Sequence, residues 1–383
     1  MHGHAERWSP GVDLAELVGS DPGNWLEGER LLIVAAIRDA AAEGLDELCW
    51  DLTWTAVTLF EAGSYLEDWG AAVAQALAAC RRAANERGEA AMIVATASWL
   101  CMQQANARAL EMSLSGVRLF AQMGDQHGQA LAHRLAGVCE VRIGQLDSAL
   151  DRFTLARSMG HEAGDRFLEV GVLRDMANIY LARGDTSAAQ KCLAEALPIS
   201  REIGSARAQA FVWHMLGRTC LRQDQPSAAQ SALDTALEFV VAANDRIGEA
   251  YVRLGLADVQ LALEVDARPV LTQVLHAATQ MGHQYLQAQV LFSIGQAEQQ
   301  RGDHAAAVRS LQASTEITRR SGAVLWQARA LDALVASYLA TGAHDEARRT
   351  ARTAAELRHD RPRRQSKPHA GPRLPAEIRK LPV

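Results

Sequence analysis

Aromatic residues make up only 5% of this 383-residue chain, although 49% of its residues are hydrophobic. A core with this composition is built mainly from Ala, Leu and Val, and Ala has the highest helix propensity of all residues. Proline is also scarce, because only five of the ten prolines lie in the first 357 residues. Two of them, Pro226 and Pro269, fall near expected helix starts, where a missing N–H does little harm. The composition therefore favours an all-α fold.

The sequence also lacks the motifs of common catalytic and nucleotide-binding sites. Lysine occurs only as Lys191, Lys367 and Lys380, and none follows a glycine. This excludes a P-loop, whose G-x-x-x-x-G-K-[ST] pattern cradles phosphates. The patterns H-E-x-x-H and G-x-S-x-G and paired Cys/His clusters are missing as well. We therefore expect no enzyme activity, no cofactor and no metal site.

Close cysteine pairs and long apolar runs are absent too. None of the six cysteines, at positions 49, 80, 101, 139, 192 and 220, forms a C-x-x-C motif. Most fall on apolar helix faces, where a thiol behaves as a small hydrophobic group, so we expect free buried thiols. No apolar run approaches the ~18 residues that span a bilayer, and Met1–Pro10 has no hydrophobic signal core. We expect a soluble cytoplasmic protein without membrane contact.

The net charge of −6 is unevenly spread along the chain. Residues 358–383 carry eight basic and two acidic side chains and five of the prolines. Such a segment buries too little surface to offset its ordering entropy, so we expect a disordered tail. Two interpretations stay open: an electrostatic arm for nucleic acid or an acidic protein surface, and a solvated tail without a partner.

The most informative pattern is a repeat of about 40 residues. Gly and Asn tolerate the left-handed backbone that follows a helix end. Two interleaved series of such markers run along the chain, and their spacing predicts two helix ends per repeat, as in an array of stacked helix pairs. The series are Gly144, Gly184, Asp224, Glu264, Gly302 and Gly342, and half a period away Asn85, Gly124, Gly164, Gly204, Asn244, Gly282 and Gly322.

Each repeat combines small and large residues at helical spacing. Gly217 marks a point where a second helix can press against the first, and Leu233 belongs to the apolar face of that second helix. Equivalent glycines occur at Gly137 and Gly295. The repeat that contains Glu264 and Pro269 is degenerate, so we expect a local irregularity in the stacking there.

On these residues the chain resembles the tetratricopeptide repeat (TPR) family over roughly residues 45–357. The matching motifs are Trp213-x-x-Leu216-Gly217, Ala177-x-x-Tyr180 and Ala149-x-x-x-Phe153-x-x-Ala156. The period exceeds the ~34 residues of the family, which implies longer helices. The resemblance implies a right-handed α-solenoid of about eight helix pairs with an extra N-terminal helix. We expect a tail at 1–22, the solenoid at 23–357 and a second tail at 358–383.

Longer TPR-like repeats of this kind occur in the C-terminal sensor regions of large bacterial STAND-type transcription regulators, including antibiotic regulatory proteins. The segment Trp25–Arg38, followed by a Trp-containing helix, resembles the start of their array. Six of the eight tryptophans lie in the first 99 residues, either as the core of a capping repeat or as a docking face. No ATPase module precedes the array, so we expect an excised sensor region or a stand-alone relative.

The first helix of each pair lines the concave surface of TPR proteins, and this carries over to a set of candidate ligand-binding positions. Spacing of four residues places each group on one helix face. Arg174 with Asn178 resembles the basic-plus-amide clamp that the family uses for peptide carboxylates, to which Arg donates as a planar fork. The alternative is a merely soluble concave face, because 36 of the 39 basic residues are Arg. The positions are Arg134, Arg142, Arg174, Asn178, His214, Arg218 and Arg222.

The leading hypothesis is a non-enzymatic protein- or peptide-binding scaffold or sensor, linked to bacterial transcription regulation and signalling. Its partner would be a protein or peptide with an acidic segment. One alternative is a nucleic-acid-associated regulator that contacts DNA through the basic tail, or reaches it indirectly. Another is a TPR-type peptide receptor or phosphatase, for which the sequence offers no distinctive catalytic residue.

Overall fold

The structure, a computed structural model, describes residue 18 and residues 22–359. Within this part of the chain there are eighteen helices and no strand, which confirms the all-α prediction. The helices are α2 (Pro22–Gly28), α3 (Arg30–Ala42), α4 (Asp46–Gly63), α5 (Leu66–Arg82), α6 (Glu86–Met102), α7 (Asn106–Gln122), α8 (Gln126–Arg142), α9 (Leu146–Glu162), α10 (Arg166–Ala182), α11 (Thr186–Glu202), α12 (Ala206–Arg222), α13 (Pro226–Ala242), α14 (Arg246–Ala262), α15 (Arg268–Gln280), α16 (Gln284–Gln300), α17 (His304–Ser321), α18 (Val324–Ala340) and α19 (His344–His359).

Helices α4 to α19 form eight consecutive pairs, from α4–α5 to α18–α19, and most of these helices have 17 residues. Helix α3 packs on α4 and α5 ahead of the first pair. The extra N-terminal helix of the sequence prediction is therefore present, in two pieces that meet at Glu29. The expected tails, 1–22 and 358–383, lie almost entirely outside the described residues.

The marker residues adopt the expected backbone with one exception. Every glycine of the two series has a positive φ, and so do Asp224, Asn244 and Glu264. Asn85 is the exception, because its φ is −82° and the preceding Ala84 takes the left-handed conformation at 55°. Asn85 instead caps the N-terminus of α6, where its side-chain oxygen accepts a hydrogen bond from the Gly88 N–H.

Glycines inside the helices allow the two members of a pair to pack closely. A Cβ atom placed on Gly217 would lie 2.6 Å from Cγ of Leu233, far inside van der Waals contact. Gly137 faces Phe153 and Gly295 faces Leu311 in the same way, each at 2.6 Å. The small-against-large pattern of the sequence thus corresponds to interlocked helices within each pair.

The stacking is irregular at α15, as the degenerate repeat indicated. This helix has 13 residues, and Pro269 lies in its first turn, where no N–H is needed. It still packs against α14 and α16, and Leu271 and Val274 are buried in the core. A shorter second helix therefore changes the local geometry without interrupting the array.

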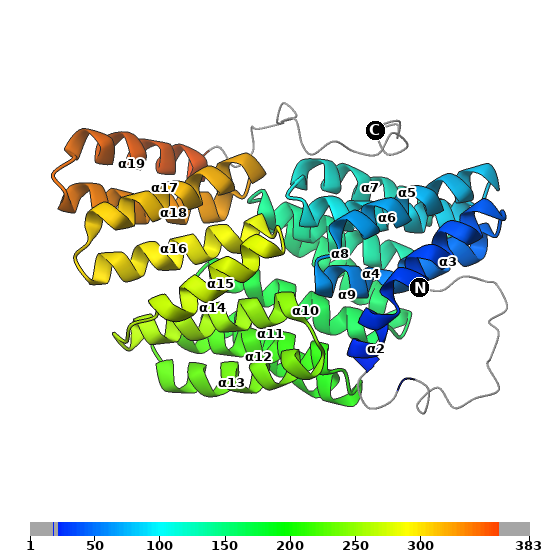
Figure 1. Cartoon of the computed structure of the whole chain (residues 1–383), viewed down its shortest axis with the longest axis horizontal. Helices are drawn as coiled ribbons and strands as arrows, with labels where there is room; N and C mark the ends of the chain where they lie inside the picture. Colours follow the sequence, from blue (N-terminus) through cyan, green and yellow to red (C-terminus); the bar gives the residue numbers. More distant parts are fainter. Residues whose placement is uncertain (1–17, 19–21, 360–383) are drawn as a thin grey trace.

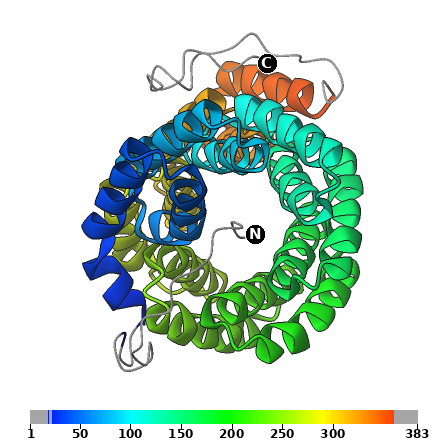
Figure 2. The same cartoon turned by 90° about the vertical axis from the view of Figure 1, so that its right-hand side faces the viewer.

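The pairs wind into a right-handed superhelix that closes into a ring when viewed along its axis (Figures 1 and 2). Segments more than 200 residues apart then meet. Ser64 Oγ donates to the Met281 carbonyl at 2.7 Å, and Asn106 Nδ2 donates to the Ser321 carbonyl at 2.8 Å. Asn244 Nδ2 donates to Glu27 at 3.0 Å. The second turn of the superhelix therefore rests on the first.

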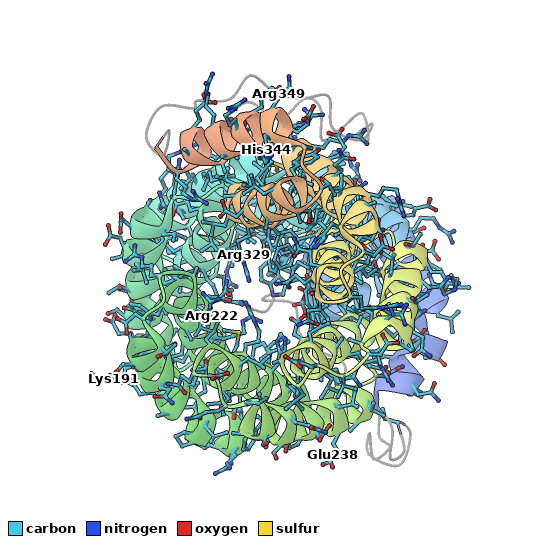
Figure 3. The ribbon with its side chains drawn as sticks, turned by 90° about the vertical axis from the view of Figure 1, so that its left-hand side faces the viewer. Lys191, Arg222, Glu238, Arg329, His344 and Arg349 are labelled. Atoms are coloured by element: carbon cyan, nitrogen blue, oxygen red, sulfur yellow. The ribbon has the colours of Figure 1, made fainter. Side chains whose placement is uncertain are left out.

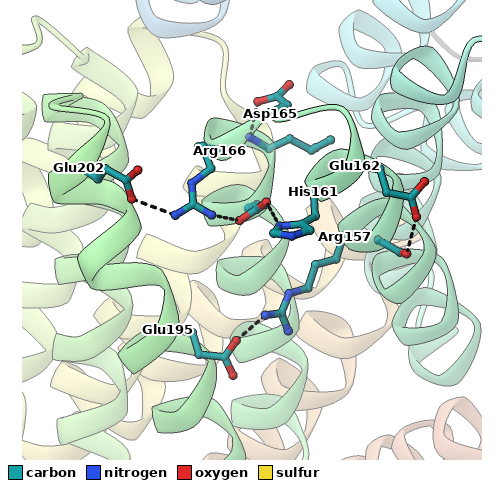
Figure 4. Close-up of polar contacts among 10 residues, drawn as sticks. Arg157, His161, Glu162, Asp165, Arg166, Glu195 and Glu202 are labelled. Atoms are coloured by element: carbon teal, nitrogen blue, oxygen red, sulfur yellow. Dashed lines mark hydrogen bonds and ion pairs between the residues drawn. The ribbon is translucent and has the colours of Figure 1, made fainter.

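Ion pairs on the outer side join one helix pair to the next (Figure 4). Arg166 donates to Glu169 on its own helix at 2.8 Å and to Glu202 on α11 at 2.9 Å, and Arg157 pairs with Glu195. Ion pairs with exposed members are screened by water and contribute little to stability.

Candidate functional site

The first helices of the pairs surround an opening along the axis of the ring, and we call their facing side the inner face. Figure 3, with side chains drawn, shows Arg222 of α12 and Arg329 of α18 pointing toward this opening, whereas Lys191 and Glu238 point outward. Arg142 of α8 lies over the ring of Tyr285 of α16, with 4.9 Å between the guanidinium carbon and the ring centroid. The inner face thus brings together helices that are four pairs apart in the sequence.

Three arginines of the inner face have carboxylate partners, and we call them the paired arginines: Arg134, Arg174 and Arg207. Arg134 and Arg174 share Asp175, with Nε–Oδ distances of 3.0 and 2.9 Å. Arg174 also lies 4.6 Å from the ring centroid of Phe211. Two cations on one buried carboxylate form a rigid contact between α8 and α10.

Arg207 is held between two carboxylates from distant parts of the chain. Its NH2 lies 3.0 Å from Glu61 Oε2 on α4, and its Nε lies 3.1 Å from Asp245 Oδ2, whose side chain is 2% exposed. Burial raises the pKa of Glu61, but the charges of Arg207, Arg134 and Arg174 outweigh it and lower the pKa overall. Charge on this side of the inner face is therefore largely neutralised within the protein.

Three other arginines have no such partner, and we call them the open arginines: Arg218, Arg222 and Arg329. Arg218 NH1 donates to the neutral amide oxygen of Asn178 at 3.1 Å. Arg329 stacks on Trp326 and Phe292, 4.4 and 5.4 Å from their ring centroids. Among residues 22–359, none of the three forms an ion pair with a carboxylate.

The open arginines repel one another. Desolvation inside the ring, followed by the charges of Arg218 and Arg222, lowers the pKa of Arg329 to about 10. The acidic group that acts on them is Asp258, which accepts a hydrogen bond from Ser293 Oγ at 2.7 Å and whose pKa is raised by burial. With a pKa of about 10, Arg329 stays charged at neutral pH, so an anion among the open arginines would gain Coulomb energy and relieve the repulsion.

Neutral aromatic groups line the inner face between these charges. Burial, followed by the charges of Arg218 and Arg174, lowers the pKa of His214 to about 3, so its imidazole is neutral. Its ring lies 6.4 Å from Tyr251, and Tyr251 meets His283 edge to face at 5.8 Å. Aromatic rings beside guanidinium groups provide both apolar contact and orientation for a bound chain.

All seven residues singled out from the sequence lie on α8, α10 and α12. The pair expected to act as a clamp is divided, because Arg174 bonds Asp175 while Asn178 accepts from Arg218. Sequence reasoning missed Tyr251 and Arg329, each the sixth residue of its helix, whereas His214 is the ninth of α12. Extending the same helix face by one turn toward the N-terminus would have included them.

A pocket of about 780 Å³ lies away from the inner face, between α3, α5 and α6. Small residues such as Gly70, Ala74 and Ala78 line it. In the part of the chain that the structure describes, no three His, Cys, Asp or Glu side chains are arranged to hold a metal ion. None of the helices within residues 22–359 has the length and apolarity needed to cross a membrane.

Residues 169–240 match the family model of the tetratricopeptide repeat, in the middle of the array of helix pairs. This stretch of the chain is thus identified as tetratricopeptide repeat. The resemblance inferred from the motifs is confirmed there, with a longer repeat than the family's usual one. No curated protein matches the sequence of this chain.

Two Rap structures share the fold of this chain at low sequence identity. A Rap protein complexed with Competence and Sporulation Factor is 11% identical with a TM-score of 0.63, covering 89% of this chain and 99% of that one. The Rap conjugation gene regulator of plasmid pLS20, in complex with the Phr* peptide, is 10% identical with a TM-score of 0.62, covering 89% and 96%. A weaker match is a signal transduction ATPase with numerous domains and a TPR sensor, from Pyrococcus horikoshii, which is 14% identical with a TM-score of 0.48, covering 81% of this chain and 47% of that one.

Proposed function

We propose that this protein is a non-enzymatic receptor that binds an acidic peptide, or an acidic segment of a protein, against its inner face. The observation that carries the proposal is the group of open arginines. Arg222 and Arg329 point toward the opening of the ring (Figure 3), the charge of Arg218 acts on Arg329, and none of the three has a carboxylate partner among the described residues, whereas the paired arginines are neutralised. The fold similarity to a Rap protein in complex with a peptide supports the same kind of ligand.

The chemistry of the inner face suits an extended peptide chain. Guanidinium forks bind carboxylates through two parallel hydrogen bonds. The side-chain oxygen of Asn178 accepts from Arg218, which leaves its NH2 group directed away from that bond and able to donate to a peptide carbonyl. Trp326 and Phe292 beside Arg329 offer apolar contact to the residues between acidic positions.

We further propose that this protein is a sensor and that ligand binding to it controls gene regulation in bacteria. One structure of the same fold is a conjugation gene regulator, which supports this link. The hypotheses of a DNA-binding basic tail and of a phosphatase stay predictions, and the tail lies outside the described residues apart from its first positions.

Selection from a library of random linear peptides tests the proposal without knowledge of the natural partner. The full chain is compared with a variant in which Arg218, Arg222 and Arg329 are replaced by Ala. A matched control removes Arg118, Arg309 and Arg352 instead, three exposed arginines on the second helices α7, α17 and α19. Circular dichroism establishes that all three proteins are folded.

The wild-type protein and the control are expected to enrich peptides with clustered Asp and Glu, and the variant without open arginines is expected to lose them. Their affinity should fall as salt is raised, because exposed charges are screened. The proposal is overturned if the enriched peptides show no excess of acidic residues. It is equally overturned if the folded variant captures the same peptides as the wild type.

A further inference from the structure

Two of the six cysteines meet in the interior although they are far apart in the sequence. The sulfur atoms of Cys101 on α6 and Cys139 on α8 lie 3.9 Å apart. Cys139 is fully buried, while Cys101 keeps 4% of its surface exposed. Helices α6 and α8 are the first helices of consecutive pairs and pack against each other. The contact therefore joins two neighbouring repeats.

The repeat itself explains why these thiols face each other. They are 38 positions apart, and the same separation joins Arg87 to Asp125 and His127 to Asp165 across consecutive pairs. Residues at this spacing occupy facing positions on successive first helices. The contact between Cys101 and Cys139 thus belongs to the regular register of the array, which holds the two sulfur atoms at a fixed distance.

The surroundings make the two thiols unequal. The Cys139 thiol donates a hydrogen bond to the Cys101 sulfur, which is the largest cause lowering the pKa of Cys101 to about 7; burial opposes the shift and the charge of Arg142 supports it. Arg142 NH1 also donates to the Cys101 carbonyl at 2.5 Å. The same hydrogen bond raises the pKa of Cys139. Burial raises the pKa of Cys49 to about 11 and of Cys80 to about 12, so those thiols are unreactive.

We propose that Cys101 and Cys139 are a modification site at which a hydroperoxide forms a reversible disulfide between two repeats. The Cys101 thiolate attacks the peroxide, so that an S–O bond forms, the O–O bond breaks and an alcohol leaves with a proton from solution. The Cys139 sulfur then attacks the sulfenic acid on Cys101, an S–S bond forms, the S–O bond breaks and water leaves. In sum, two thiols and one hydroperoxide give one disulfide, one alcohol and one water.

The geometry requires a small adjustment. A disulfide has an S–S distance of about 2.05 Å, so bond formation requires the sulfurs to approach by roughly 2 Å, through side-chain rotation and a slight shift of α8. The bond would tie α6 to α8 next to Arg142. Because a crosslink limits the unfolded chain, the oxidised protein should resist unfolding better than the reduced one.

Peptide mapping of the native full-length chain tests this site. After treatment with a small excess of tert-butyl hydroperoxide and alkylation of the remaining thiols, trypsin releases Gly88–Arg108 and Leu135–Arg142, each with one cysteine. The expected product is the disulfide-linked pair of these peptides, which dithiothreitol separates. Cys49 and Cys80 should be recovered alkylated.

Single variants give a second readout that does not depend on the crosslink. Cys139→Ser should accumulate a sulfenic acid at Cys101 that dimedone traps, while Cys101→Ser should leave Cys139 reduced under the same treatment. The proposal is overturned if native wild-type protein keeps both thiols reduced while urea-unfolded protein loses them. It also fails if Cys101 and Cys139 are oxidised without becoming linked.

Discussion

The paired and the open arginines occupy the same inner face, yet their surroundings differ in one respect. Arg134, Arg174 and Arg207 each contact a carboxylate from another helix or from the adjoining position, and Asp175 and Asp245 are buried beneath them. Among the open arginines, Arg218 contacts an amide and Arg329 contacts aromatic rings, and the charges of Arg218 and Arg222 act on Arg329. The two groups share the residue type and the location, and they differ in whether a carboxylate neutralises the arginine.

This comparison separates a structural from a binding role for one residue type. A buried carboxylate that loses its cation is costly, so a paired arginine contributes to the fold. An open arginine leaves no buried partner behind when it is removed, so its removal affects mainly what binds from outside. The four predictions below test this division.

The largest effect is expected on removing Arg207. Arg207→Ala leaves Asp245, 2% exposed, without its cation, and should lower the free energy of unfolding by about 3–5 kcal/mol. Urea denaturation followed by circular dichroism measures the change. A loss below that of an ordinary surface substitution would show that the paired group has no structural role.

A smaller loss is expected when the shared carboxylate is neutralised. Asp175→Asn keeps the shape but removes the charge that Arg134 and Arg174 share, and should cost about 1–3 kcal/mol. It should also convert two paired arginines into open ones and raise affinity for an acidic peptide selected on the wild type. Fluorescence titration measures this gain, and unchanged affinity would contradict the division of roles.

The third prediction concerns the pH dependence of peptide binding. Burial raises the pKa of Asp258, so this carboxylate loses its charge as pH falls, and the field of Arg218 and Arg329 then strengthens. His283 and His214, with pKa values of about 4 and 3, stay neutral between about pH 5 and 8. Affinity for an acidic peptide should therefore rise toward pH 5.

Asp258→Asn isolates this effect. At pH 8 the variant should bind the acidic peptide about fivefold more tightly than the wild type, because one nearby negative charge is lost. Its affinity should change little further on acidification. Because the raised pKa means that protonation favours the folded state, the substitution should not weaken the fold at that pH. Peptide titrations of the wild type and the variant across this pH range test the prediction. It is wrong if the affinity of both proteins rises equally toward pH 5.

The smallest effect on stability is expected for Arg222→Ala. Arg222 is exposed and contributes to the repulsion at Arg329, so the free energy of unfolding should change by no more than about 0.5 kcal/mol. Peptide affinity should nevertheless fall. Parallel urea denaturation of this variant and Arg207→Ala compares an open with a paired arginine directly. Equal destabilisation would contradict the division into structural and binding roles.

Much of the fold followed from local patterns. The glycine series predicted the helix ends, because a left-handed residue is needed there and few residues other than glycine adopt it readily. The exception shows the limit of the method: Ala84 takes the left-handed position beside Asn85, whose side chain serves better as a cap. Gly217 marked the close approach of two helices for a different local reason, because it has no side chain.

The candidate site was predictable only in part. Helix periodicity placed Arg218 and Arg222 on one face of α12, and Arg222 points toward the opening of the ring (Figure 3). The partners of the arginines were not predictable, since Glu61 is 146 positions from Arg207 and the ring brings them together only by closing. The contact of Cys101 with Cys139 had a signal in its spacing of 38, close to the period of the repeat.

The amino-acid sequence by itself determined the helices, their pairing and the face that each turns inward, because backbone propensity and side-chain spacing act over a few residues. Only the tertiary structure decided which inner arginines are neutralised, since counter-charges arrive from other turns of the superhelix. Small rotations between successive pairs add up to the closure of the ring, and no local pattern encodes their sum.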